Sequence, residues 1–282
     1  MNLEIIMRGK IRSPLTYEGN KYKVIDKLKK ELGTQKVFVD VFGGSGTVVA
    51  NMDSEIRYYN ELDKKVYDLI ENLSLTHVLS IVESVRVFQE HFDLNNELKR
   101  KENYYRARYF YNNNKKTLNL FALSKNSFSN YIRFNSKGDF NSPCGKISCK
   151  DYKALRSKIK DFQEAMSGVN FKNLDYLNLV YEVIRENKNE KDILFYFDPP
   201  YLGTVATYNN AWGESENKTL LALCELLDKS GYKFAMSNVF TKNNLVFQEW
   251  AKKYNIIFFG NVYNNCNYQL KDKEKTEVLI KN

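Results

Sequence analysis

A short apolar run that ends in a stiff acidic turn is the feature that most constrains the fold of this chain. Residues 193–197 (ILFYF) are all apolar and lead directly into Asp198-Pro199-Pro200-Tyr201. A continuous apolar run of this length between turn signals is typical of a strand buried on both faces, as in parallel sheets. Because open α/β sheets bind ligands beyond the carboxyl ends of such strands, the acidic turn is predicted to lie at a ligand site.

The alternation of strand, turn and helix continues along both ends of the chain. Residues 36–42 (KVFVDVF) are a predicted strand, and the turn Gly43-Gly44-Ser45-Gly46 then leads into TVVANM, which can begin a helix. Further strands are predicted at 56–60, 193–197, 232–236, 256–259 and 278–280, and helices at 64–92, 215–230 and 244–254. This pattern predicts an α/β fold with a mostly parallel open sheet.

A basic segment interrupts this alternation. Residues 99–160 carry 16 Lys and Arg against three Asp and Glu, so they hold more than the whole net charge of +9. Tyrosine and phenylalanine interleave with these charges, which favours a surface that follows nucleic-acid phosphates over a merely solvated face. The sequence therefore predicts a core domain made of residues 1–73 and 165–282, with an inserted lobe at 74–164.

The sequence offers few residues for metal-dependent chemistry and no segment suited to a membrane. The four cysteines form no CxxC pair and the two histidines stand at no metal-ligand spacing, so no metal site is predicted. The chain has no run of about 18 apolar residues, so neither export nor a membrane span is predicted and a cytoplasmic location is expected.

The acidic turn has the chemistry needed to hold an amino group. Its two prolines lack amide protons and fix φ, which leaves stiff carbonyl acceptors. The Asp198 carboxylate and the Pro199 carbonyl can each accept a hydrogen bond from an exocyclic amine, which frees the nitrogen lone pair for attack on a sulfonium methyl group. Tyr201 offers a ring on which a flipped base can stack. The alternative interpretation is a rigid loop with no catalytic role.

The glycine turn indicates a cofactor without phosphates. Residues Phe42 to Gly46 lack the GxGxxG spacing of a dinucleotide site, so the turn is interpreted as a backbone bend beside a ligand such as S-adenosylmethionine. Glu61 stands at the end of the next predicted strand, 21 residues after Asp40, where an acid can accept the two ribose hydroxyls. A surface glutamate with no such role is the alternative.

Taken in order, these segments resemble the Dam-type DNA adenine methyltransferases over nearly the whole chain. The resemblance begins at Tyr17-Glu18-Gly19-Asn20-Lys21 and continues through Asp40 to Gly46 and Asn60 to Asp63, then the basic lobe, then Asp198 to Tyr201. It implies a Rossmann-like S-adenosylmethionine-dependent methyltransferase sheet with an inserted, mainly helical DNA-recognition lobe that contains a β-hairpin. Residues 1–73 and 165–282 would form the catalytic domain, and residues 74–164 the target-recognition domain.

The resemblance and the glycine turn together give a set of candidate site residues. Asp198, Pro199 and Tyr201 are the catalytic candidates. The candidates for contact with S-adenosylmethionine, which would leave as S-adenosylhomocysteine, are Tyr17, Lys21, Phe42, Gly44, Ser45, Gly46, Glu61, Asp175, Tyr176 and Asp198. Two positions depart from the family pattern, because relatives usually carry Asp at the position of Glu61 and many carry Gly at that of Asn20.

Residues 126–135 and 138–143 resemble the hairpin that enters DNA in this family. The resemblance implies DNA contacts by Phe128, Ser129, Tyr131, Arg133, Asn135 and Pro143. Arg133 would read guanine through O6 and N7, with a phosphate contact as the alternative, and Phe128 would fill the gap beside the flipped base. GATC is the preferred target sequence, although Tyr131 is bulkier than the residue expected at its position.

The sequence thus predicts a site-specific enzyme that methylates the exocyclic amine of adenine in double-stranded DNA. The enzyme is expected to be a monomer and to serve DNA methylation or restriction-modification. The same geometry also suits the amine of cytosine or an RNA amine. A catalytically silent DNA-binding relative is a third interpretation, which the intact Asp-Pro-Pro-Tyr turn disfavours. A nuclease is disfavoured because no carboxylate cluster with metal-binding spacing accompanies the basic lobe.

Overall fold

The computed structural model describes residues 9–146, 149–201, 212–241, 244–260 and 276–282. The chain divides into two compact units. The helical unit comprises Met1–Asp26, Gly44–Asn51 and Asp63–Ser167, and the sheet unit comprises Lys27–Gly43, Met52–Leu62 and Gly168–Asn282. The helical unit includes the N-terminal segment and residues 44–46 of the glycine turn as well as the predicted lobe at 74–164. The assignment of a catalytic and a target-recognition domain stays a prediction.

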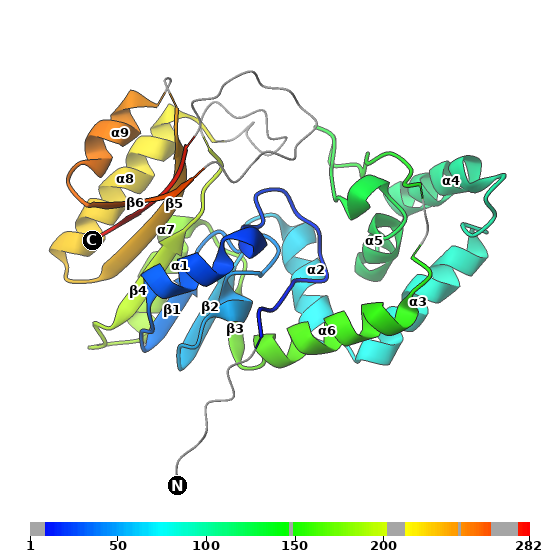
Figure 1. Cartoon of the computed structure of the whole chain (residues 1–282), viewed down its shortest axis with the longest axis horizontal. Helices are drawn as coiled ribbons and strands as arrows, with labels where there is room; N and C mark the ends of the chain where they lie inside the picture. The colour runs from blue at the N-terminus through cyan, green and yellow to red at the C-terminus, as the bar shows by residue number, and fades with distance from the viewer. Residues whose placement is uncertain (1–8, 147–148, 202–211, 242–243, 261–275) are drawn as a thin grey trace, which may run out of the picture. The chain divides into compact units, whose positions relative to one another are not determined.

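The sheet unit is built on a seven-stranded sheet (Figure 1). Its strands are β1 (Val37–Asp40), β2 (Ile56–Asn60), β3 (Val169–Lys172), β4 (Ile193–Phe197), β5 (Lys233–Phe240), β6 (Asn255–Gly260) and β7 (Thr276–Lys281). Their order is β3-β2-β1-β4-β5-β7-β6. Among the described strands, β7 pairs antiparallel with both β5 and β6, and the other pairs are parallel. The predicted α/β class with a mostly parallel sheet is confirmed.

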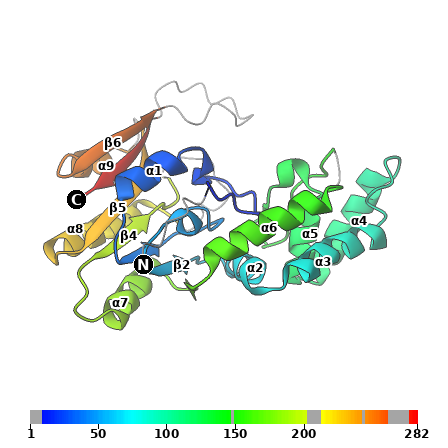
Figure 2. The same ribbon diagram turned by 60° about the horizontal axis from the view of Figure 1, so that its bottom comes forward.

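The apolar composition of the central strands follows from their position. Every residue of β1 and β4 is buried, because helices cover both faces of the sheet. Apolar residues of α7 (Tyr176–Glu186), α8 (Glu214–Lys229) and α9 (Leu245–Ala251) share one core cluster with alternate residues of the strands. The helix α1 (Ile25–Leu32) lies on the face opposite α7 (Figures 1 and 2).

The helical unit is organised around α5 (Thr117–Ser124), whose residues from Leu120 onward are all buried. The helices α2 (Lys64–Leu75), α3 (Val78–His91) and α4 (Arg100–Asn113) pack against α5, and α6 (Tyr152–Met166) packs against α2 and α3. Side chains cap two of these helices. Asp63 accepts a hydrogen bond from the amide of Lys65 at the start of α2, and Asp151 accepts one from Ala154 at the start of α6.

One predicted helix is largely absent. After the glycine turn the chain forms only a single 3-10 turn at Val49–Asn51, where a helix was predicted to begin. The side-chain Nδ2 of Asn51 donates hydrogen bonds to the carbonyls of Thr47 (2.7 Å) and Ile11 (2.9 Å), and its Oδ1 accepts one from the backbone amide of Ile11 (2.9 Å). These bonds fasten the turn to the N-terminal segment and end it there, before β2 begins at Ile56.

Candidate functional site

The strand order reverses direction where β1 and β4 lie side by side. From β1 the chain crosses to β2 on one side, and from β4 it crosses to β5 on the other. Loops that leave in opposite directions open the crevice in which open α/β sheets bind ligands. Phe42 and Gly43 follow β1 at this edge, and the turn Asp198 to Tyr201 follows β4. The amide of Val41 donates to the carbonyl of Tyr196 at 3.0 Å and continues the pairing of the two strands toward these turns.

The acidic turn is held in a defined conformation. Asp198 is half-buried and Pro199 is buried, and the hydroxyl of Tyr201 donates a hydrogen bond to Oδ1 of Asp198 at 3.0 Å. Beneath the turn, the fully buried Tyr196 lies 2.7 Å, oxygen to oxygen, from Ser237. Burial raises the pKa of Tyr196 well above its usual value, and the charge of Asp198 raises it further. The phenol therefore stays protonated, and Asp198 has a neutral neighbour.

The turn after β1 requires a glycine at its first position. The amide of Gly43 donates to the carbonyl of Asn60 at 2.7 Å. A Cβ atom at Gly43 would lie 2.3 Å from Cε2 of the fully buried Tyr59 and 2.9 Å from the carbonyl oxygen of Asn60. The closeness of β2 thus fixes this residue by packing. The neighbouring Gly44 and Gly46 have positive φ values of 50° and 71°. Glycine is favoured there because residues with a Cβ atom are strained in this backbone conformation.

Asn60 joins the carboxyl ends of three strands, a role that the sequence did not suggest. Its side-chain amide donates to the carbonyls of Val41 and Leu174, both at 3.0 Å, and its Oδ1 accepts a hydrogen bond from the amide of Leu174 at 3.0 Å. Asn60 is buried, so these bonds are shielded from water.

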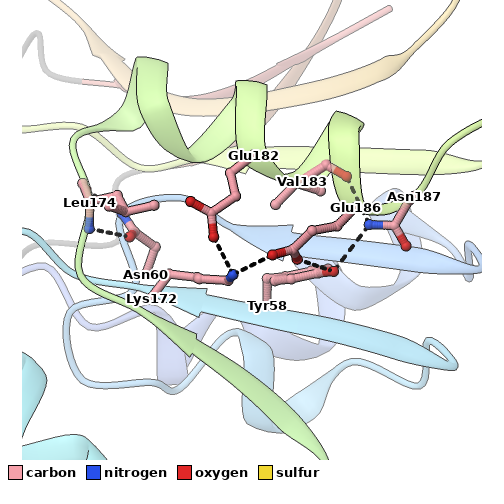
Figure 3. A network of polar contacts seen from close by, with 8 residues as sticks. All are labelled: Tyr58, Asn60, Lys172, Leu174, Glu182, Val183, Glu186 and Asn187. Atoms are coloured by element: carbon pink, nitrogen blue, oxygen red, sulfur yellow. Dashed lines mark hydrogen bonds and ion pairs between the residues drawn. The ribbon is translucent and has the colours of Figure 1, made fainter.

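A network of polar contacts joins α7 to β2 and β3 (Figure 3). Lys172 of β3 forms ion pairs with Glu182 and Glu186 of α7. Tyr58 donates to Glu186 at 3.0 Å and accepts a hydrogen bond from Asn187 at 3.1 Å. The hydrogen bond from Lys172 holds the pKa of Glu186 below its usual value. The network fixes α7, at whose N-terminal end two of the predicted cofactor contacts lie.

Those two contacts, Asp175 and Tyr176, have different environments. Asp175 caps α7, because its Oδ1 accepts hydrogen bonds from the amides of Leu177 and Asn178 at 3.0 and 3.1 Å, and its Oδ2 bonds the Asn178 side chain. Tyr176 packs against Phe42, with ring centroids 5.9 Å apart. Burial raises the pKa of Tyr176, and the carboxylates of Glu216 and Asp175 add to this effect.

Phe42 and Tyr176 belong to an aromatic cluster that Phe197 and Trp212 complete. The ring of Trp212 meets Phe42 edge-on at 5.5 Å and Tyr176 at 5.8 Å. The Nε1 atom of Trp212 is buried and has no hydrogen-bond partner among the residues that the structure describes. Sequence reasoning missed Trp212, because a single tryptophan outside any motif gives no signal of its own.

Glu61 directly follows β2, next to the turn after β1. Its amide donates to the carbonyl of Lys172 at 3.3 Å, and its carbonyl accepts a hydrogen bond from the side chain of Asn173 at 2.6 Å. These bonds fix the backbone of Glu61 at the carboxyl edge of the sheet. The sheet unit therefore brings Phe42, Glu61, Tyr176 and Asp198 to one edge.

The helical unit holds the remaining predicted cofactor contacts. Tyr17 lies against Gly44, where a Cβ atom would approach Cδ1 of its ring to 3.2 Å. The side chain of Asn20 donates to the hydroxyls of Ser45 and Thr47 at 2.8 and 2.9 Å. The asparagine that departs from the family pattern thus fastens the glycine turn to the N-terminal segment. The buried Lys21 donates from Nζ to the carbonyl of Gly19 at 3.0 Å.

The six predicted DNA contacts all lie in one hairpin segment, defined here as residues 127–144. Two isolated antiparallel bridges, Ser127 with Cys144 and Phe134 with Phe140, join its arms in place of continuous strands. The hydroxyl of Tyr104 in α4 donates to the carbonyl of Ser142 at 2.9 Å and anchors the segment. The predicted hairpin is therefore present, in a form stabilised by turns and by anchoring to α4.

The exposed side chains of the hairpin segment include large aromatic rings. Phe128 is 47% exposed and Tyr131 is 39% exposed. Between them, Ser129 and Asn130 adopt positive φ values of 54° and 56°, a conformation that costs non-glycine residues about 1 kcal/mol each or more. Such strain is typical of functional segments.

Two other predicted DNA contacts in the hairpin segment are tied to its backbone. Asn135 shapes the tip, because its Oδ1 accepts hydrogen bonds from the amides of Lys137 and Asp139 at 3.0 and 2.9 Å. Arg133 is exposed and bonds Asn141 on the opposite arm.

Within the described ranges, no group of three or more His, Cys, Asp or Glu side chains is arranged to hold a metal ion. Nor does the part of the chain that the structure describes contain a helix both long enough and apolar enough to span a bilayer.

The strand order, with the single reversed strand β7 between β5 and β6, defines a Rossmann-like methyltransferase fold. Residues 17–265 match the model of the D12 class N6 adenine-specific DNA methyltransferases, and the chain belongs to that family. The predicted resemblance to Dam-type enzymes is confirmed, because a DNA adenine methylase of Vibrio cholerae is 25% identical over 210 residues, 72% of this chain and 71% of the relative.

Two more similar relatives are longer proteins. The type II methyltransferase M.FokI of Planomicrobium okeanokoites is 30% identical over 283 residues, which cover 96% of this chain and 43% of the relative. The modification methylase LlaI of Lactococcus lactis is 32% identical over 253 residues, 86% of this chain and 39% of the relative. The chain thus spans about two fifths of the length of these relatives.

Proposed function

We propose that this chain transfers a methyl group from S-adenosylmethionine to the exocyclic amine of an adenine in double-stranded DNA. The observation that carries the proposal is the acidic turn at the carboxyl end of β4, beside β1 where the strand order reverses, in a chain of the adenine-specific family. The turn supplies a half-buried carboxylate whose position is fixed by the hydroxyl of Tyr201.

In this reaction the acidic turn holds the target amine. The Asp198 carboxylate and the Pro199 carbonyl each accept a hydrogen bond from one of its two N–H groups. These bonds draw the nitrogen toward tetrahedral geometry, so its lone pair is no longer delocalised into the ring. S-adenosylmethionine, when bound, would supply a methyl group from its positively charged sulfur and leave as S-adenosylhomocysteine, and the methylated amine would release one proton. Tyr201 offers its ring to the flipped base, a contact that contributes about 1–3 kcal/mol. Asp198 is also a candidate contact for the cofactor.

The residues at the sheet edge fit this cofactor. The aromatic cluster around Phe42 and Tyr176 offers flat apolar faces for an adenine ring, and the buried Nε1 of Trp212 is a donor for a ligand acceptor. Glu61 would accept the ribose hydroxyls, its longer side chain replacing the aspartate usual in relatives. In the helical unit, Tyr17, Lys21, Gly44, Ser45 and Gly46 are the proposed contacts, and Asp175 in the sheet unit would act from its capping position.

Cofactor binding should raise the melting temperature of the protein. At 100 times the dissociation constant a ligand stabilises the native state by about 2.7 kcal/mol, which corresponds to a rise in melting temperature of about 5 °C or more.

We expect Glu61→Gln to weaken S-adenosylhomocysteine binding about tenfold, because one charged acceptor is lost. Thermal unfolding at increasing ligand concentration measures both effects. Glu190→Gln, at the opposite edge of the sheet, should leave the ligand-induced rise unchanged, and no rise in the unaltered protein would contradict the cofactor assignment.

The hairpin segment is the proposed DNA contact. Phe128 would fill the space beside the flipped base, with Arg133 reading guanine and Ser129, Tyr131, Asn135 and Pro143 making further contacts. The exposure of Phe128 and Tyr131 and the local positive charge support this role. GATC is the proposed target sequence.

The function is tested by incubating purified protein with S-adenosylmethionine and duplex DNA that contains all short sequence contexts, and mapping modified bases at single-base resolution. Methylated adenines in one sequence context are expected. Modified cytosines would establish cytosine as the target, and unmodified DNA that the protein still binds would establish a silent DNA-binding relative.

A further inference from the structure

Arg133 and Asn141 face each other across the hairpin segment. The amide of Asn141 donates to the carbonyl of Arg133 at 2.9 Å, which aligns the two arms at this position. Toward the base, the amide of Phe128 donates to the carbonyl of Pro143 at 2.8 Å, and toward the tip, the amide of Asn135 donates to the carbonyl of Asp139, also at 2.8 Å. The two residues therefore lie in a backbone register that is fixed on both sides.

Within the part of the chain that the structure describes, the guanidinium of Arg133 is bound along one edge. Its Nε donates to Oδ1 of Asn141 at 2.8 Å, and its Nη2 donates to the carbonyl oxygen of Asn141 at 3.1 Å. Nε and Nη2 lie along the same edge of the planar guanidinium, so these bonds occupy two of its five N–H groups. The other edge, between Nη1 and Nη2, keeps its donors. Among the described residues, no carboxylate forms an ion pair with Arg133.

The edge that remains is the one that suits guanine. A bidentate contact to O6 and N7 needs two parallel donors in one plane, which the Nη1–Nη2 edge provides. Asn141 is uncharged, so it orients the guanidinium and leaves its positive charge in place. An aspartate at this position would offset that charge. Fixing the side chain before DNA binds also lowers the entropy lost in complex formation, which for a free arginine is large.

We propose that Asn141 is a positioning residue for base recognition, holding Arg133 so that its free edge meets guanine in the target sequence. This inference rests on the proposed function, in which Arg133 reads a base and not a phosphate. Asn141 itself would touch no base in this arrangement; it acts through Arg133.

The test compares the base preference of variants at every position of the target. Wild-type protein, Arg133→Ala, Asn141→Ala and Asn141→Asp each methylate a randomised duplex library, which is then sequenced for modified adenines. Asn141→Ala should lower the preference for guanine about tenfold, at the same position that Arg133→Ala relaxes and at no other. Asn141→Asp keeps the Oδ1 acceptor and should retain the preference, with weaker overall binding. Combining Asn141→Ala with Arg133→Ala should cause no further loss at that position.

A matched control separates positioning from general loosening of the hairpin segment. Asn112 of α4 anchors the segment through two bonds to the backbone of Phe140, at 2.9 and 3.2 Å, and has no hydrogen bond to Arg133. Asn112→Ala should reduce methylation evenly across all sequences, whereas Asn141→Ala should act at one position.

Three results would overturn the proposal. One is an unchanged guanine preference in Asn141→Ala, and another is an even loss that matches Asn112→Ala. The third is a guanine preference that survives in Arg133→Ala. A wild-type protein that modifies no adenine would contradict the proposed function as well. That outcome is distinguishable from failure of the inference alone, in which the wild-type protein methylates its site and the Asn141 variants show the same base preference.

Discussion

Replacing Asp198 with alanine is expected to lower the rate of methyl transfer by at least about 100- to 1,000-fold, the loss typical when one preorganised polar group at a reacting centre is removed. The carboxylate is the charged acceptor proposed for the target amine, and the hydroxyl of Tyr201 donates a hydrogen bond to one of its oxygens. Without it the target amine keeps a single acceptor, the carbonyl of Pro199, and its lone pair stays delocalised into the ring. Transfer of tritium from labelled cofactor to duplex DNA measures the effect under single-turnover conditions.

The other end of the same strand supplies the control for this variant. Asp192 precedes β4 and accepts hydrogen bonds from the amide of Lys36 at 2.8 Å and from Nζ of Lys233 at 2.7 Å. Asp192→Ala should cost about 1 kcal/mol of stability and leave methyl transfer intact at a temperature well below unfolding. DNA binding by Asp198→Ala should also be retained. Transfer by Asp198→Ala within tenfold of the unaltered protein would remove Asp198 from the mechanism.

The parts of the fold that followed from sequence were those set by local pattern. The strands β2 and β4 have the predicted bounds, Ile56–Asn60 and Ile193–Phe197. In β4 every residue is apolar and buried, which leaves an uninterrupted signal in the sequence. The short edge strand β3 was not singled out, since only its first residue is buried and its pattern resembles that of a loop. The turn at Val49–Asn51 was predicted to begin a helix. The bonds between Asn51 and Ile11 that end the turn join residues far apart in the chain, so no local pattern indicates them.

The candidate site divides in the same way. Asp198 and the glycine turn could be predicted, because strand ends followed by turns mark the carboxyl edge of a sheet. Asn20, Asn60 and Asn141 could not, although each fixes a predicted residue or turn. Their roles depend on partners 19 to 114 residues away for Asn20 and Asn60, and on the pairing register of the hairpin for Asn141. Short amide side chains carry no pattern of their own, so only the folded chain shows what they hold.

Replacing Gly43 with alanine is expected to lower the free energy of unfolding by about 1–3 kcal/mol, the usual cost of overpacking a filled core. The new methyl group would lie 2.3 Å from Cε2 and 2.4 Å from Cδ2 of Tyr59, a ring that is fully buried and cannot turn away. The carbonyl oxygen of Asn60 would lie 2.9 Å away on the same side, so the turn after β1 must move away from β2. That movement would displace the neighbouring Phe42 from the aromatic cluster. A lower melting temperature, by about 5 °C, and weaker S-adenosylhomocysteine binding are therefore expected together.

Two further variants decide whether the clash with Tyr59 is the cause. Gly9→Ala adds the same methyl group where no atom lies within 4 Å, and it should leave both quantities unchanged. Tyr59→Leu shortens the obstructing side chain, so adding Gly43→Ala to Tyr59→Leu should cost less than adding it to the unaltered protein, with a coupling of about 0.5 kcal/mol or more. Strictly additive losses would show that the glycine is needed for another reason. An unchanged melting temperature in Gly43→Ala would show that β2 does not confine the turn, and the cofactor assignment would then lose the rigid edge on which it depends.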